Sequence, residues 1–168
     1  MRVVVTGTPG TGKTTATDLV DSDLELVHLN EAIERRELYT ETDPERGSKV
    51  ADLDAIRAAY ADAENLLVES HLAHHLDVDR VVVLRCAPRT IRDRLLERGE
   101  SAESAAENAE SEALDVILSE AVQRHGAEAV YEIETTDQSP ADIGREIEAV
   151  IAGEREPSAG TVDYTDYL

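Results

Sequence analysis

The residues best suited to chemistry form a glycine-rich segment near the start of the chain, Gly7-Thr8-Pro9-Gly10-Thr11-Gly12-Lys13-Thr14. It matches the phosphate-binding pattern G-x-x-x-x-G-K-[ST] at every fixed position. Glycines let successive backbone N–H groups turn toward a phosphate. Lys13 can reach the β- and γ-phosphates of a nucleotide, and the Thr14 hydroxyl can bind Mg²⁺. We therefore expect this loop, with Thr15 just beyond it, to hold a nucleoside triphosphate and Mg²⁺.

The segments on either side of the loop agree with this interpretation. Arg2-Val3-Val4-Val5-Thr6 is a short β-branched run that predicts a strand, and residues 13–21 predict a helix. Strand, glycine loop and helix is the order that phosphate binding requires, because the helix adds the positive end of its dipole. The context therefore disfavours a chance match.

A carboxylate and a histidine follow another segment that is typical of a buried strand. Glu69 comes directly after Leu66-Leu67-Val68, and His71 lies two residues further on. Side chains alternate in extended backbone, so residues 69 and 71 point to the same side. We expect Glu69 to hold Mg²⁺ together with Thr14, and His71 to contact a phosphate or orient a water. The alternative is that Glu69 is an exposed acid at a strand end.

Two more histidines, His74 and His75, raise the question of a zinc site. Their spacing from His71 allows His71 and one or both of them to share a helical face. No cysteine lies nearby, however, so zinc stays the alternative. We expect His74 and His75 to be surface or interface residues.

The arginines are unevenly distributed along the chain. Five lie within fourteen residues that contain only two acids, so this segment carries +3 and the rest of the chain −24: Arg85, Arg89, Arg92, Arg94 and Arg98. Such a patch in an acidic protein is suited to clamp a polyphosphate. Arg94 and Arg98 are one helical turn apart and can act together. The alternative is that these arginines pair with local acids on a solvated helix.

A smaller basic point, Arg35 and Arg36, follows the second predicted strand. Phosphoryl-transfer enzymes of this build often bind their acceptor in that region. We therefore expect Arg35 and Arg36 to contact the acceptor.

The amino-acid composition indicates the salt conditions and the compartment in which the protein works. The chain has 168 residues, a net charge of −21 and only two lysines, Lys13 and Lys49. Acid excess and lysine depletion suggest a protein that works in very high salt, where self-repulsion is screened; an ordinary acidic protein is the alternative. The single cysteine, Cys86, excludes an internal disulfide framework, and no signal peptide or membrane span is apparent. We expect a cytoplasmic protein with no direct DNA binding and no membrane association.

Strand-like and helix-like segments alternate, which predicts an α/β fold with a five-stranded parallel sheet and helices on both faces. The expected strands are 2–6, 24–29, 66–68, 81–84 and 129–133. The expected helices are 13–21, about 33–38 with Asn30 as N-cap, 50–63, 88–98, 100–125 and 139–151. Residues 40–48 read as a loop and 153–168 as an acidic tail. Ligands of such sheets bind at the carboxyl ends of the strands.

Four motifs together resemble a known family, the archaeal and eukaryotic nuclear-type adenylate kinases. They are the phosphate loop extended through Thr15, Glu37-Leu38-Tyr39, Glu69-Ser70-His71, and Arg94-Leu95-Leu96-Glu97-Arg98-Gly99 with Glu107-Asn108 downstream. The resemblance covers about residues 1–152. That family consists of small P-loop kinases that also act as ATPases in small-ribosomal-subunit maturation.

The resemblance implies a three-layer P-loop NMP-kinase fold over 1–152, with an acceptor-binding segment over about 30–60 and a small lid over about 99–108. It implies that ATP and AMP are converted to two ADP with Mg²⁺. It assigns catalytic roles to Lys13, Glu69, His71, Arg94 and Arg98. It also implies an ATPase role in rRNA maturation, with a basic small-subunit ribosomal protein as partner.

This chain departs from the family pattern at three points. Glu69 stands where the family usually has aspartate, and Glu34 stands where an arginine is expected, so Arg35 or Arg36 would have to substitute for it. Lid lysines expected near Glu103 are missing, which leaves Arg94 and Arg98. Two rival functions stay open: a ribosome-assembly ATPase with little kinase activity, and a kinase for a small metabolite.

Overall fold

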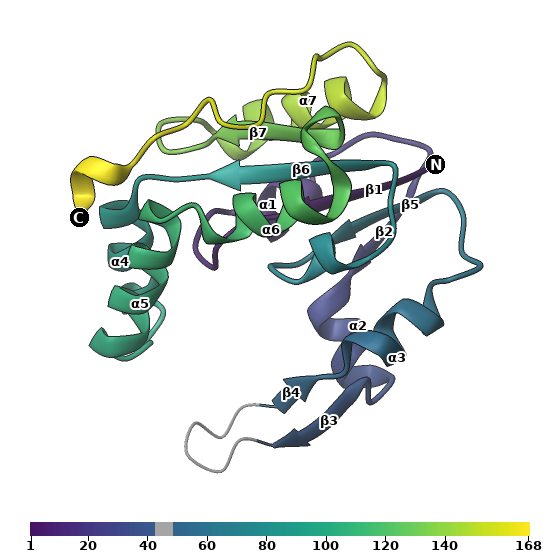
Figure 1. The fold of residues 1–168 in the computed structure, drawn as a ribbon, viewed down its shortest axis with the longest axis horizontal. Coiled ribbons are helices and arrows are strands. Elements are labelled where there is room, and N and C mark those ends of the chain that lie inside the picture. The colour runs from purple at the N-terminus through teal and green to yellow at the C-terminus, as the bar shows by residue number, and fades with distance from the viewer. Residues whose placement is uncertain (43–48) are drawn as a thin grey trace.

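A five-stranded parallel sheet forms the centre of the computed structural model, which describes residues 1–42 and 49–168 (Figure 1). Its strands are β1 (Arg2–Thr6), β2 (Glu25–His28), β5 (Leu66–Glu69), β6 (Arg80–Arg85) and β7 (Val130–Glu134), in the order β2-β5-β1-β6-β7. Each neighbouring pair is parallel. The predicted fold class is therefore confirmed.

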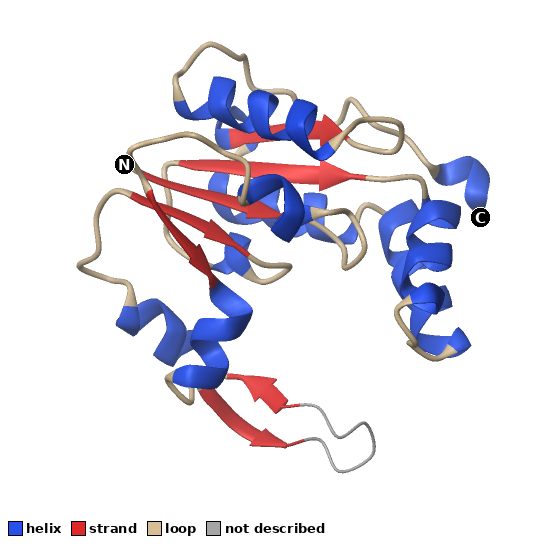
Figure 2. Ribbon diagram, turned by 180° about the vertical axis from the view of Figure 1, so that it is seen from behind, coloured by secondary structure: helices blue, strands red, loops and turns tan. Residues whose placement is uncertain are grey.

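Side-chain alternation in β1 explains why helices cover both faces of the sheet. Val3 and Val5 pack in one buried cluster and Val4 in another, and all three are fully buried. The cluster with Val3 and Val5 lies under α1 (Lys13–Thr17) and α7 (Pro140–Ile151). The cluster with Val4 lies under α2 (Leu29–Arg35), α3 (Leu53–Ala59) and α6 (Val116–His125). The sheet is thus the middle of three layers (Figure 2).

Two parts of the chain project from this body (Figures 1 and 2). One is a helical hairpin of α4 (Pro88–Glu97) and α5 (Ala102–Ala113), which buries Cys86, Ile91, Leu95 and Ala105 in a small cluster of its own. The other, which we call the arm, consists of α2, α3 and an antiparallel pair, β3 (Tyr39–Thr42) and β4 (Lys49–Ala51). The loop expected over 40–48 is strand at residues 40–42, and residues 43–48 lie outside the described chain.

Several helix boundaries differ from the sequence-based prediction, and the helix expected over 13–21 ends at Thr17. The helix expected over 100–125 is two helices, because Asp115 takes a left-handed conformation with φ 56° between α5 and α6. The helix expected over 50–63 begins only after β4, with Asp52 as N-cap accepting from the Ala55 N–H. Asn30, expected as an N-cap, lies inside α2, which starts directly after β2. Two of these differences involve partners distant in sequence, since Asp115 accepts from Arg85 and Asn30 accepts from the Ser70 hydroxyl. The start of α3 is set locally by the Asp52 cap.

The C-terminal residues pack on the body of the molecule. Arg155 donates to the Glu132 carbonyl at 2.8 Å, and the Thr161 N–H donates to the Glu132 carboxylate at 2.9 Å. The Tyr164 hydroxyl donates to Glu134 at 2.5 Å. Short 3-10 turns occur in the described part of the chain at η1 (Ala73–His75), η2 (Ala127–Ala129) and η3 (Thr165–Tyr167). Within the described ranges, no helix combines the length and apolarity that crossing a membrane would take.

Candidate active site

The glycine-rich loop follows β1 directly and needs glycine at defined places. A Cβ on Gly7 would lie 2.7 Å from the Leu84 carbonyl oxygen, so the loop can leave the sheet here only without a side chain. Gly12 has φ 89° and forms the N-cap of α1. The loop therefore wraps around the start of α1, as the sequence predicted.

Lys13 lies inside the turn of this loop. Its Nζ donates to the carbonyls of Gly7 at 2.9 Å and Thr8 at 3.1 Å. Burial lowers the pKa of Lys13 to about 8, although the charges of Glu69 and Glu112 act in the opposite direction. The amine is thus held at the place where the motif predicts donor phosphates.

Glu69 and Thr14 meet at the end of β5. The Thr14 hydroxyl donates to Glu69 Oε1 at 3.2 Å, and the Glu69 side chain is buried. A hydroxyl and a carboxylate are hard oxygen ligands of the kind that Mg²⁺ prefers. The donor set present here therefore fits that ion.

A third residue, His28, holds the other oxygen of Glu69. His28 Nδ1 lies 2.6 Å from Glu69 Oε2, and its Nε2 lies 2.9 Å from Asp18 Oδ1. Burial opposes protonation of His28, but the hydrogen bonds to Glu69 and Asp18 outweigh it and raise the pKa of the ring. Sequence reasoning missed this residue: His28 ends its strand as Glu69 does, and the adjacency of β2 and β5 was not predicted.

Two adjoining hollows open beside these residues. The first, which we call the loop hollow, measures about 300 Å³ and is lined by Pro9, Gly10, Gly12, Lys13, Thr14, Thr15, Asn30, Glu69, His71, Arg98 and Glu100. The second, the arm hollow, measures about 410 Å³ and is lined by Asn30, Ile33, Glu34, Lys49, Ala51, Leu53, His71 and Leu72. Asn30 and His71 line both. A molecule in one hollow would therefore lie next to a molecule in the other.

His71 occupies the junction in a neutral form. Burial, together with the nearby charge of Lys13, lowers its pKa to about 4. The prediction that residues 69 and 71 point to the same side agrees with this arrangement, since both line the loop hollow.

Thr8 and Thr11, also predicted to bind the nucleotide, turn their hydroxyls into the protein. The Thr8 hydroxyl donates to Glu112 Oε1 at 3.0 Å, and the Thr11 hydroxyl donates to the Thr8 carbonyl at 2.9 Å. Both residues are buried. Their side chains therefore shape the loop, and only their backbone could reach a phosphate.

Arg94 and Arg98 have different environments. Arg98 is exposed at the end of α4 and lines the loop hollow. Arg94 instead donates to the Gly10 carbonyl at 2.9 Å and lies 3.7 Å from the Cys86 sulfur. Arg98 can reach a ligand in the loop hollow, whereas Arg94 supports the loop through its hydrogen bond to the Gly10 carbonyl.

Arg85 does not belong to a basic surface patch, contrary to the prediction. It is buried and meets three carboxylates, Glu112 at 3.2 Å, Asp115 at 2.6 Å and Glu132 at 2.8 Å. Burial alone would lower its pKa, but these charges raise it. The carboxylates that Arg85 recruits come from α5, β7 and the break before α6, a grouping that the sequence did not predict.

Glu112 connects this buried cluster to the loop. Its Oε1 accepts from the Thr8 hydroxyl, and its Oε2 accepts from Arg85 and, at 2.8 Å, from the Cys86 N–H. Burial raises the pKa of Glu112 in spite of these partners. Nothing in the sequence distinguishes Glu112 from its acidic neighbours in α5.

The predicted acceptor residues lie beside the arm hollow rather than in its lining. Arg35 and Arg36 are exposed at the end of α2, and the Arg36 guanidinium lies 5.3 Å from the centre of the Tyr60 ring. Lys49 does line the arm hollow, where its Nζ lies 2.7 Å from Glu34 Oε2. The scarcity of lysine is the feature of the sequence that could have identified Lys49 as a site residue, because both lysines of the chain line a hollow.

His74 and His75 turn away from His71. His74 is buried, contrary to the prediction of a surface residue, and its Nδ1 lies 2.8 Å from the Thr6 hydroxyl oxygen. Both rings face Glu120 of α6, whereas His71 faces the hollows. The zinc set that would have combined His71 with a later histidine is therefore not formed.

Comparisons with known proteins agree with this geometry. The AAA domain family matches residues 3–115. A protein of Halobacterium salinarum named "Putative adenylate kinase" is 62% identical over 169 residues, covering 100% of both chains. A protein of the same name from Natronomonas pharaonis is 61% identical over 168 residues, again covering 100% of both. Among solved structures, shikimate kinase from Bacteroides thetaiotaomicron superposes with a TM-score of 0.61 at 17% identity, over 90% of this chain and 98% of that one, which shows a shared fold.

Proposed function

The chain belongs to the AAA domain family and to the group of archaeal proteins named "Putative adenylate kinase", and from that premise we propose that it transfers the γ-phosphoryl group of ATP to AMP. The observation that carries the proposal is the pair of hollows joined at Asn30 and His71. Phosphoryl transfer needs a donor and an acceptor side by side and roughly in line. A hydrolase would need only the loop hollow.

On the donor side, the backbone of the loop and Lys13 bind the phosphates of ATP. Thr14 and Glu69 would hold Mg²⁺, which neutralises charge on the donor phosphates when it is bound. Arg98 stabilises negative charge on the transferring group from the rim of the loop hollow. His28 orients Glu69 from the side opposite Thr14.

On the acceptor side, AMP occupies the arm hollow with its phosphate toward His71. A phosphate oxygen of AMP forms a bond to the γ-phosphorus as the bond from that phosphorus to the β,γ-bridging oxygen breaks, which leaves two ADP. The neutral His71 ring orients the groups that meet at the junction. Lys49 exchanges Glu34 for the acceptor phosphate, while Arg35 and Arg36 stay predictions for the same role. The family resemblance supports two further assignments, acceptor binding by the segment over about 30–60 and a small lid over about 99–108.

A coupled assay tests the proposal directly. ADP formation from ATP should depend on AMP, in about molar KCl so that self-repulsion is screened. A panel of other nucleoside monophosphates and of hydroxylated metabolites identifies the acceptor class. If no monophosphate supports turnover, the kinase assignment is wrong, and ADP formed without acceptor would point to an ATPase.

A second candidate function is the one that the family resemblance implies, an ATPase with a ribosomal protein as partner. The observation in their favour is the net charge of −21, which suits a basic protein partner. A pull-down with small-subunit ribosomal proteins across a range of salt, with and without ATP, tests this. Failure to retain any of them at low salt would rule out such a complex.

A further inference from the structure

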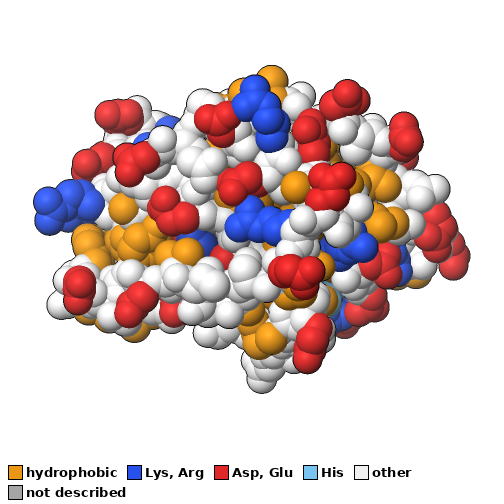
Figure 3. All heavy atoms as spheres, turned by 90° about the horizontal axis from the view of Figure 1, so that it is seen from above, with side chains coloured by type: hydrophobic (Ala, Val, Ile, Leu, Met, Phe, Trp, Pro, Cys, Tyr) orange, Lys and Arg blue, Asp and Glu red, His pale blue; other side chains and the backbone are white. Residues whose placement is uncertain are grey.

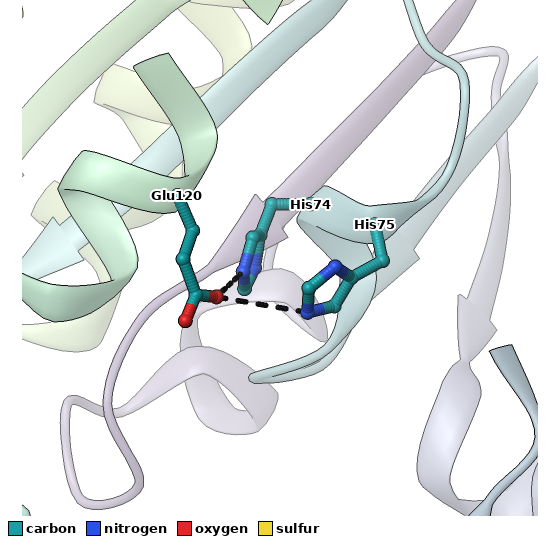
Figure 4. A group of neighbouring side chains, drawn as sticks. All are labelled: His74, His75 and Glu120. Atoms are coloured by element: carbon teal, nitrogen blue, oxygen red, sulfur yellow. Dashed lines mark hydrogen bonds and ion pairs between the residues drawn. The ribbon is translucent and has the colours of Figure 1, made fainter. Parts of the chain in front are cut away.

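A second cluster of chemistry-bearing side chains lies outside the two hollows, where α6 packs on η1. His74 Nε2 lies 2.6 Å from Glu120 Oε2, and His75 Nε2 lies 3.6 Å from the same oxygen (Figure 4). The three ligand atoms all lie within 4.8 Å of one another. We propose that His74, His75 and Glu120 bind a divalent transition-metal ion of the Zn²⁺ class.

The donor set selects this class of ion. Two imidazole nitrogens and one carboxylate oxygen are ligands that Zn²⁺ and its neighbours prefer, whereas Mg²⁺ prefers oxygen alone. Donors at tetrahedral zinc lie roughly 3.4 Å apart, given bonds of about 2.0–2.2 Å. The spacings of 2.6 and 3.6 Å bracket that value, so small side-chain rotations suffice to form the site.

His74 is already oriented for such a role. Its ring is buried, and its Nδ1 contacts the Thr6 hydroxyl at 2.8 Å, which directs Nε2 toward Glu120. Metal-binding histidines ordinarily use their second nitrogen in this way. His125 Nε2 donates to the His74 carbonyl at 2.7 Å and so fixes the backbone of η1 against α6.

The charges around the cluster permit a cation. Burial lowers the pKa of His74 and His75, so both rings are neutral near pH 7, the form that binds metals. Two arginines act on the cluster, and each is paired with an acid: Arg57, which donates to the His75 carbonyl, with Asp54 at 3.1 Å, and Arg124 with Asp77 at 2.8 Å. Solvent reaches the cluster through a surface hollow lined by His75, Glu120, Gln123 and Arg124, so water can supply a fourth ligand.

A metal bound here would join two elements to the sheet. Its ligands come from η1 and α6, and His74 also contacts Thr6, the last residue of β1 before the glycine-rich loop. Such a cross-link stabilises the folded state by mass action, because the unfolded chain lacks the preformed site. The expected effect is on stability, and it does not depend on which nucleotide the protein uses.

Calorimetric titration of the metal-stripped full chain with Zn²⁺ tests the proposal. The buffer contains about molar KCl, which screens the acidic surface, and excess Mg²⁺, which competes with Zn²⁺ for the oxygen ligands of the loop hollow. We expect one Zn²⁺ per chain, a higher Tm, and a Co²⁺ form with the visible spectrum of a tetrahedral nitrogen and oxygen site. His75→Ala and Glu120→Gln should each weaken binding roughly tenfold or more, within the range for losing a metal-site group. The matched control Glu128→Gln changes an exposed acid beyond the cluster and should bind like wild type.

Two results would overturn the site. One is no saturable Zn²⁺ binding by the wild type. The other is binding that neither His75→Ala nor Glu120→Gln weakens, which would place the ion elsewhere and leave an ordinary hydrogen-bonded cluster. His74 is left intact because its contact with Thr6 makes a folding defect the first consequence of its loss. Kinase activity plays no part in either result, so failure here leaves the proposed function untouched.

Discussion

Arg94 and Arg98 lie one helical turn apart in α4, yet their surroundings predict different defects. Arg98→Ala removes an exposed guanidinium that lines the loop hollow, so kcat should fall roughly 10²-fold while stability changes by less than about 0.5 kcal/mol. Arg94→Ala removes the donor to the Gly10 carbonyl and should cost about 1 kcal/mol of stability as well as activity. Turnover and urea unfolding of both variants decide this. A kcat for Arg98→Ala within threefold of wild type would show that Arg98 is only a solvated arginine.

His28 is a positioning residue, since it acts on Glu69 and not on the substrates. His28→Ala frees one oxygen of Glu69, so we expect kcat to fall about tenfold and more Mg²⁺ to be needed for half-maximal rate. His28→Asn keeps an N–H donor near Glu69 and should recover part of the loss. Asp18→Asn, which alters only the outer partner of the ring, is the matched control with a smaller effect. An unchanged Mg²⁺ requirement in His28→Ala would contradict the role.

Some of the residues at the candidate site could be predicted from a single sequence, and others could not. Lys13 and Thr14 could be predicted from a spaced motif, and Glu69 and His71 from the end of one buried strand; all four line the loop hollow. His28 meets Glu69 across 41 residues, and Thr8 meets Glu112 across 104. Contacts of that kind depend on which strands and helices become neighbours, and a single sequence carries no local pattern for them.

Glu112 connects the helical hairpin of α4 and α5 to the glycine-rich loop. Glu112→Gln keeps one oxygen to accept from Arg85 and the Cys86 N–H, but it places an NH2 group opposite the Thr8 hydroxyl and leaves Arg85 with less negative charge around it. Because Arg85 keeps Asp115 and Glu132, the expected cost is that of weakened hydrogen bonds to a charged group, about 1.5–3 kcal/mol. Glu110→Gln, an exposed position of the same helix, should stay within about 0.5 kcal/mol. Chemical denaturation of both variants measures this difference. Equal denaturation midpoints would show that Glu112 does not stabilise the contact between the hairpin and the loop.

The C-terminal segment is a second element with a structural task. Glu132 is buried and accepts from the backbone N–H groups of Gly160 and Thr161 while it pairs with Arg85. Removing residues 158–168 takes away these donors, so we expect a loss of about 2–4 kcal/mol of stability, in proportion to the hydrogen bonds to a charged group. Denaturation of the truncated chain measures it, with removal of 165–168 alone as control. The sequence left open whether this tail was ordered, because its partners lie in β7 and not near it in the chain.

At the scale of the whole molecule, the parallel sheet and its two helical layers could be predicted because strands and helices alternate along the chain. The antiparallel pair of the arm could not, since β3 is short and polar and was predicted as loop, while Val50 and Ala51 of β4 were assigned to the following helix. The same holds for the break at Asp115, which is stabilised by the buried Arg85. Local patterns thus predicted the layers, whereas a long-range ion pair marks the break between α5 and α6.

The net charge of −21 is the other property of the whole molecule, and acidic side chains are spread over the face seen in Figure 3. Their mutual repulsion destabilises the folded chain at low salt, where the Debye length is about 10 Å at 0.1 M, and weakens as it falls to about 3 Å at 1 M. We therefore expect Tm to rise steeply in KCl up to about 1 M and to level off beyond. Stability that does not respond to KCl would contradict this.

A charge-change experiment separates screening from the general effect of salt on burial. Asp23→Lys with Asp62→Lys changes two exposed positions away from both hollows, and each substitution adds two positive charges, so the net charge moves from −21 to −17. If repulsion limits stability, the double variant should unfold at a higher temperature than wild type at about 0.1 M KCl and should match it at about 1 M. Asp23→Asn with Asp62→Asn should show half of the gain. If salt acts instead by being excluded from apolar surface, sulfate should raise Tm more than chloride does. The Tm values of all three proteins should then rise in parallel with salt concentration without converging. Parallel curves would therefore show that the acidic surface serves solubility or a partner rather than stability in salt.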